Sequence, residues 1–120
     1  MVERIRFIKH AGRDILLLDF SNFNADDFFE AIDFAKDVIA SQPEKSLLTL
    51  TDVTGARFDK YVTMELKEFA SHNKPYVKAA AVVGVKGLKE VILNTIMLFS
   101  QRKFHAFDSI EDAKEWLTKN

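Results

Sequence analysis

The sequence contains no cysteine, only four glycines and only two prolines, and each of these shortages excludes some classes of protein. Without cysteine there is no disulfide framework, no thiol nucleophile and no cysteine ligand for a metal. Few glycines and prolines, with no low-complexity tract, argue against a disordered chain. The 17 basic and 18 acidic residues give a net charge of −1. The basic residues do not form the cluster that is typical of a nucleic-acid-binding protein. We therefore expect no nucleic-acid partner.

Long apolar runs are missing as well. The longest one stays far below the roughly 20 residues that a membrane-spanning helix needs. The first residues, MVERIRFIKH, lack the apolar region of a signal peptide. These absences predict a cytoplasmic protein without a transmembrane segment. The chain does contain 48% hydrophobic residues, including 11 phenylalanines, which is enough for the core of a single domain spanning residues 1–120.

The order of apolar patterns along the chain predicts an α/β fold with the elements ββαβαβαβα. Two apolar runs on either side of the turn at 11–14 predict an N-terminal hairpin. Three further strands are expected at 47–53, 79–85 and 103–107. The residues able to cap the helices are Asn24, Asp59 and either Asp108 or Ser109. Strands separated by helices require right-handed crossovers, so we expect a mixed, mainly parallel sheet with helices packed on it.

The stretch 79–99, AAAVVGVKGLKEVILNTIMLF, joins the most apolar strand to the most apolar helix. No polar residue interrupts 79–85, which predicts a central strand buried on both faces. The helical stripe expected to pack on the sheet comprises Leu88, Val91, Ile92, Thr95, Ile96 and Phe99. Leu93 and Met97 would then project outward, as would Tyr61 and Met64 on the preceding helix. These four side chains are the expected surface for a protein partner or for a homodimer.

Two segments carry a resemblance to a known family, LLTLTDVTGARF at 47–58 and the tail VVGVKGL…NTIMLFSQRKFHAFDSIEDAKEWL. In these segments and in its element order, the chain resembles the bacterial SpoIIAA-like family, relatives of the STAS domains of anti-sigma-factor antagonists. The resemblance covers nearly the whole chain. It implies a STAS-like α/β fold and a non-enzymatic role in protein interaction or regulation. Some members are compared with the CRAL-TRIO fold, which implies the alternative of a small-molecule or lipid-binding domain with an apolar pocket.

The sequence differs from the family pattern at the residue that is phosphorylated in STAS antagonists. Their pattern is Asp-hydrophobic-Ser followed by Phe-x-Asp-Ser, and its last serine accepts the phosphate. Here 52–54 and Phe58 match the first part, but the Asp-Ser step falls on Lys60 and Tyr61. The resemblance therefore implies an interaction module that lacks the usual phosphoacceptor serine.

Polar residues follow two of the expected parallel strands, at the sheet edge where open α/β folds bind ligands. A small anionic ligand would find unpaired N–H groups at the start of the third helix. The candidate ligand-binding residues are Asp52, Thr54, Arg57, Gly84, Lys86 and Gly87. GVKG is neither a Walker loop nor a GxGxxG fingerprint. The alternative is a tight glycine turn in which Asp52 caps the amides of its own loop.

The sequence shows no catalytic or metal-binding constellation. His10, His72 and His105 fall on separate elements without metal-ligand spacing. Ser21 and Ser100 lack a nucleophile elbow. We therefore predict that the protein is not an enzyme and holds no metal and no cofactor.

Overall fold

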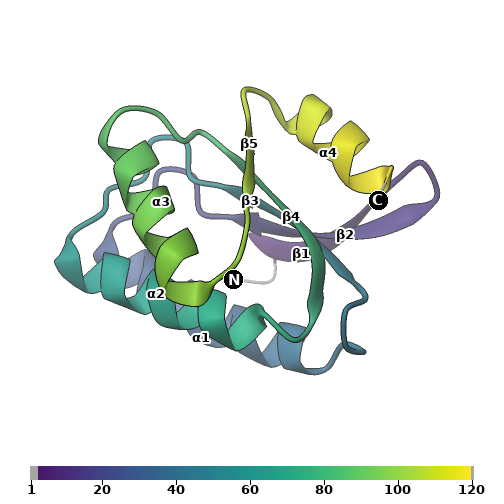
Figure 1. The fold of residues 1–120 in the computed structure, drawn as a ribbon, viewed down its shortest axis with the longest axis horizontal. Helices are drawn as coiled ribbons and strands as arrows, with labels where there is room; N and C mark the ends of the chain where they lie inside the picture. The colour runs from purple at the N-terminus through teal and green to yellow at the C-terminus, as the bar shows by residue number, and fades with distance from the viewer. Residues whose placement is uncertain (1–2, 120) are drawn as a thin grey trace.

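The computed structural model describes residues 3–119, in which four helices surround a five-stranded sheet (Figure 1). The elements are β1 (Ile5–His10), β2 (Arg13–Asp19), α1 (Ala25–Ala40), β3 (Leu47–Asp52), α2 (Lys60–Asn73), β4 (Val77–Val83), α3 (Leu88–Ser100), β5 (His105–Phe107) and α4 (Ile110–Thr118). The predicted order ββαβαβαβα is confirmed. None of the described helices is both long enough and apolar enough to span a bilayer.

The strands lie in the order β1-β2-β3-β4-β5, with β1 antiparallel to β2 and every other pair parallel. The mixed, mainly parallel sheet is therefore confirmed. Ala11 and Gly12 connect β1 to β2 with φ angles of 51° and 78°, the left-handed values that a tight hairpin turn requires. β4 pairs with β3 on one side and with β5 on the other, so the expected interior strand after residue 79 is confirmed, although β3 is the middle strand of the five. Helices cover both faces of β4 as they cover both faces of β3. An apolar composition therefore does not show which of the two is the middle strand of the sheet.

The two faces of the sheet carry separate apolar clusters. Successive side chains of a strand point to opposite faces. On β2, Leu16 and Leu18 belong to the cluster beneath α1, α2 and α3, whereas Ile15 and Leu17 belong to the cluster beneath α4. Figure 1 shows α1, α2 and α3 on one side of the sheet and α4 on the other. Because helices cover both faces of the inner strands, ligands can reach those strands only at their ends or along an open edge.

Phenylalanine rings fix the chain around the carboxyl ends of β2 and β3. Phe20 and Phe28 are fully buried, and their ring centroids lie 5.4 Å apart. The Phe28 ring also lies 5.4 Å from the rings of Phe23 and Phe58, in edge-to-face contacts. Phe58 comes from the loop between β3 and α2. The cluster thus holds that loop and the start of α1 against the sheet.

Three of the described helices begin at a side-chain cap that the sequence predicted. Asn24 accepts from the Asp27 amide at 3.0 Å while the Asp27 carboxylate accepts from the Asn24 amide at 3.0 Å, which completes a capping box. Asp59 caps α2 and Ser109, rather than Asp108, caps α4. α3 differs, because Gly87 precedes it and provides no side-chain cap.

Candidate functional site

The carboxyl ends of β3 and β4 bring part of the predicted anion site together. One Asp52 carboxylate oxygen accepts from the Thr54 amide at 2.9 Å and from the Thr54 hydroxyl at 2.7 Å. Gly84 at the end of β4 has a φ of +88°, and a Cβ at this position would overlap Thr54. Glycine is therefore required for the two loops to touch. The arrangement matches the predicted alternative, in which Asp52 caps its own loop.

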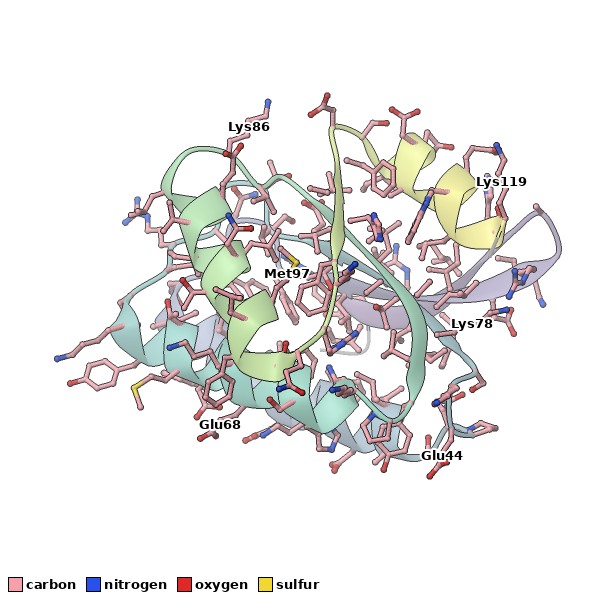
Figure 2. All side chains as sticks on the ribbon, viewed as in Figure 1. Glu44, Glu68, Lys78, Lys86, Met97 and Lys119 are labelled. Atoms are coloured by element: carbon pink, nitrogen blue, oxygen red, sulfur yellow. The ribbon has the colours of Figure 1, made fainter. Side chains whose placement is uncertain are left out.

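The two cations predicted for this site, Arg57 and Lys86, are not part of the contact between the two loops. The Arg57 side chain is exposed, while its backbone amide donates to the Phe23 carbonyl at 2.9 Å. Lys86 and Gly87 are exposed, and Figure 2 shows the Lys86 side chain extending away from the body of the protein. No described hydrogen bond or ion pair links Arg57 or Lys86 to Asp52. An anion site at this edge stays a prediction.

A different cation, Lys89, occupies this end of the sheet. Its ammonium donates to the Val53 carbonyl at 2.8 Å and lies 5.9 Å from the centroid of the Phe58 ring. These contacts attach the first turn of α3 to the loop that follows β3. Lys89 was missed because a lysine within an amphipathic pattern normally marks a solvent-facing position. The signal that could have found it is its spacing of four and seven residues from Leu93 and Ile96, the apolar residues that pack inward beside it.

α3 turns a different face to the sheet than the sequence predicted. Ile96 and Ser100 are 6% and 5% exposed, and Leu93 packs against the main core. The Met97 sulfur accepts from the Phe104 amide at 3.3 Å, and Figure 2 shows Met97 on the side of α3 that faces the sheet. The expectation that Leu93 and Met97 project outward is therefore wrong.

The physical reason for this error is that α3 is apolar on most of its circumference, so periodicity does not determine its rotation. Two polar side chains also lie on the inner side because backbone carbonyls accept hydrogen bonds from them. Lys89 donates to Val53, and the Ser100 hydroxyl donates to the Ile96 carbonyl at 2.7 Å. The satisfied hydrogen bonds remove the usual cost of placing such groups inside.

The face of α3 that points away from the sheet is largely apolar. This outer face of α3 comprises Leu88, Val91, Thr95, Leu98 and Phe99. Its four apolar side chains are 73%, 60%, 83% and 57% exposed in chain order. The Thr95 hydroxyl donates to the Val91 carbonyl at 3.0 Å, and the exposed Asn94 and Glu90 border the outer face. On α2, Tyr61 and Met64 are 59% and 58% exposed, as predicted.

A small cavity lies between the sheet and the inner sides of α2 and α3. Its volume is about 80 Å³, and most of its lining is apolar. Thr49 and Asn73, 4% and 3% exposed, contribute polar groups to it. This volume is smaller than the roughly 150 Å³ that encloses one benzene molecule. The described interior therefore contains no pocket of acyl-chain size at this position, and it does not support the lipid-binding alternative.

Arg102 is a further residue that the sequence did not single out. Its guanidinium donates to the Ala70 carbonyl at 3.1 Å and lies 4.6 Å from the centroid of the Phe104 ring. Burial lowers the pKa of Arg102 to about 10, because desolvation disfavours the charged form. The residue ties the segment after α3 to the end of α2, and it lines both the small cavity and an outer cleft beside β4.

The histidines lie in three unrelated surroundings. His10 Nε2 lies 2.8 Å from the Glu115 carboxylate, and this hydrogen bond lowers the pKa of Glu115. His72 Nδ1 lies 2.8 Å from the Asn73 side-chain oxygen, and the His105 ring lies 4.3 Å from the Trp116 ring. Within residues 3–119, no three histidine or acidic side chains gather in a way that could hold a metal ion.

Comparison with solved structures identifies a protein of the same fold. An uncharacterized protein of the DUF3478 family from Shewanella loihica PV-4, described as having a SpoIIAA-like fold, matches with a TM-score of 0.73. The match covers 94% of this chain and 91% of that chain, at 16% sequence identity. No protein-family model and no curated protein matches the sequence. The chain therefore has the SpoIIAA-like fold that the resemblance implied.

Proposed function

From the SpoIIAA-like fold and the apolar outer face of α3, we propose that this protein is a non-enzymatic, STAS-like interaction module that self-associates through α3. The observation that carries the proposal is the set of four apolar side chains, 57% to 83% exposed, on a single helix face. Single exposed apolar residues are common, but a continuous stripe is typical of a surface that another chain covers.

A second copy of the chain is the partner that fits this face. The five residues of the outer face of α3 are uncharged, and antiparallel packing of two α3 helices across a two-fold axis would keep the two exposed Glu90 carboxylates at opposite ends of the interface. The Lys67 ammonium lies at its border, 5.6 Å from the centroid of the Phe99 ring. The long stem of this lysine adds apolar surface there while its charge stays in water.

Self-association would also offer a form of regulation that needs no phosphoacceptor serine. Lys60 and Tyr61 stand where STAS antagonists carry the Asp-Ser step. Asp59 just before them is engaged as the cap of α2, with its carboxylate 2.8 Å from the Val62 amide. We therefore propose that regulation depends on assembly of the chain rather than on a phosphate at this loop.

The proposal is tested by the mass of the particle in solution. Light scattering after size exclusion is expected to show a dimer for the wild-type protein and a monomer for Val91→Asp combined with Leu98→Asp. Both side chains are largely exposed, so the fold should persist, which circular dichroism checks. Met64→Asp is the matched control, because Met64 is 58% exposed on α2 and lies outside the outer face of α3. A wild-type monomer throughout a concentration series would refute self-association.

Native mass spectrometry of the purified protein tests the alternative. An interaction module is expected to appear without a retained small molecule, because the cavity of about 80 Å³ holds little more than a few waters. An added mass of lipid size would contradict the proposal and show that α3 can move away from the sheet.

A further inference from the structure

One edge of β4 is only partly covered by its neighbours. β4 pairs with β3 from Val77 to Val83, but it pairs with β5 only from Ala81 to Val83. In Figure 1 the chain that leads from α3 into β5 separates from the first half of β4. Among the described residues, 77–80 thus have no partner strand on the side away from β3. Such an edge can accept an additional extended segment.

The Ala80 amide is a backbone group that faces this open side. The Val83 carbonyl accepts from the Val53 amide at 2.9 Å, so Val83 directs its backbone groups toward β3. Alternate residues of a strand direct theirs to opposite edges. Ala80 follows the register irregularity near Lys78, so the regular alternation applies to it. Its N–H group therefore points toward the side on which an added segment would lie, and Ala80 itself is 5% exposed.

A cleft of about 370 Å³ lies along this edge, and positive charge dominates its lining. Lys74, Lys78, Arg102 and Lys103 line it, and no aspartate or glutamate does. None of these four cations forms an ion pair within the part of the chain that the structure describes. The cleft therefore presents several positive charges that no described carboxylate neutralises.

The two walls of the cleft differ in chemistry. Arg102 reaches it from the side of α2, where its guanidinium also bonds to the Ala70 carbonyl. Trp116 of α4 forms the opposite side, with its ring 4.3 Å from that of His105. A bound segment would thus meet a guanidinium on one side and an aromatic ring on the other.

The positive charge of the cleft determines which kind of segment can bind along this edge of β4. A second copy pairing through the same edge would bring Lys78 and its neighbouring cations against identical cations, which is unfavourable. The register shift near Lys78, where Val77 and Ala79 pair with successive residues of β3, further disfavours pairing of two like edges. An acidic segment reverses the sign of the interaction, because each of its carboxylates meets an unneutralised cation.

From this juxtaposition we infer that the open edge of β4 binds an extended acidic peptide segment of a partner protein. The segment adds as a short strand beside Ala80. Because strand side chains alternate, its carboxylates face Arg102 while the intervening apolar side chains face Trp116. The preferred sequence therefore alternates acidic and apolar residues. This site is separate from the outer face of α3, and it does not require self-association.

The test uses the full chain and a fluorescein-labelled, end-capped peptide, Glu-Val-Glu-Val-Glu, with binding followed by fluorescence anisotropy. The expected result is saturable binding that weakens with added salt. Lys78→Glu should weaken it by about five-fold or more, since it replaces an attraction by a repulsion. Lys60→Glu is the matched control, because Lys60 is exposed at the other end of α2, and it should leave the affinity unchanged.

Two further arms separate strand addition from simple attraction between charges. The peptide Glu-Glu-Glu-Val-Val has the same composition without the alternation and should bind more weakly. Hydrogen exchange at the Ala80 amide should slow when the alternating peptide is bound.

Equal binding of both peptides, unchanged exchange at Ala80, or competition by inorganic phosphate at similar concentrations would overturn the inference. Unchanged affinity in Lys78→Glu would overturn it as well. The α3 double variant should bind the peptide as wild type does, so the two proposals can fail independently.

Discussion

The rotation of α3 about its own axis decides which residues form the proposed dimer surface, and a pair of leucine substitutions tests it directly. The apolar pattern predicts that Leu88 is buried and that Leu93 projects outward. In the structure Leu88 is 73% exposed, whereas Leu93 packs against the main core. Leu88→Ala and Leu93→Ala remove the same atoms from the same helix, so the difference between them depends on the environment of each side chain.

The expected magnitudes follow from burial. Removing a fully buried leucine side chain costs about 2–5 kcal/mol. Leu93 is only half-buried and adjoins the existing cavity, so we expect Leu93→Ala to lower the free energy of unfolding by about 1.5 kcal/mol. For a chain of this length that corresponds to a fall in melting temperature of roughly 5 °C. Leu88→Ala should change the free energy of unfolding by less than about 0.5 kcal/mol.

Urea unfolding followed by circular dichroism measures both differences. The experiment is run at low protein concentration, because self-association through the outer face of α3 would add stability that Leu88→Ala also removes. A repeat at higher concentration identifies that contribution. If Leu88→Ala costs as much as Leu93→Ala at the lowest concentration, the rotation of α3 described here is incorrect and the proposed dimer surface fails with it.

Four further substitutions test two glycine positions, a helix cap and an ion pair. Gly84→Ala places a Cβ against the loop after β3 at a φ of +88°, and it should lower the free energy of unfolding by about 1–3 kcal/mol in chemical denaturation. Gly12→Ala, at a φ of +78° with nothing within 4 Å, should cost less, and an equal loss would show that the close contact is unimportant. Asn24→Ala breaks the capping box and should lower the free energy of unfolding by about 1 kcal/mol, measured by urea unfolding; an unchanged midpoint would contradict the cap. The hydrogen bond from His10 lowers the pKa of Glu115 in the folded chain, so the pair adds stability above the ordinary pKa of 4.5 that is lost as the pH falls through the lowered value. Melting temperatures of wild type and Glu115→Gln should therefore differ at about pH 6 and converge in acid, and a difference that persists in acid would refute this linkage.

Most of the fold could be predicted because its signals are local. Asn24, Asp59 and Ser109 cap the helices that they precede, and each needs only a donor three residues away in the sequence. The hairpin turn likewise depends on adjacent residues. The resemblance to the SpoIIAA-like family added the arrangement of the elements, and the match to a solved structure of that fold confirms it.

The candidate sites were less predictable because they depend on contacts between distant segments. The sequence placed Asp52, Thr54 and Gly84 at one sheet edge correctly, since strand ends determine that position. It did not reveal that Lys89 rather than Lys86 turns toward the Val53 carbonyl. That choice depends on the rotation of α3, which its nearly uniform apolar composition leaves undetermined.

By itself, the sequence determined the class of fold, the number and order of its elements, their caps and the absence of thiol chemistry. Each of these follows from residue types or from neighbours along the chain. Only the tertiary structure decided which side of α3 is exposed, that β3 rather than β4 lies at the centre, and that four cations line the open edge of β4. The reason is physical: an apolar helix or strand has several favourable orientations, and packing against segments far away in the chain selects one of them.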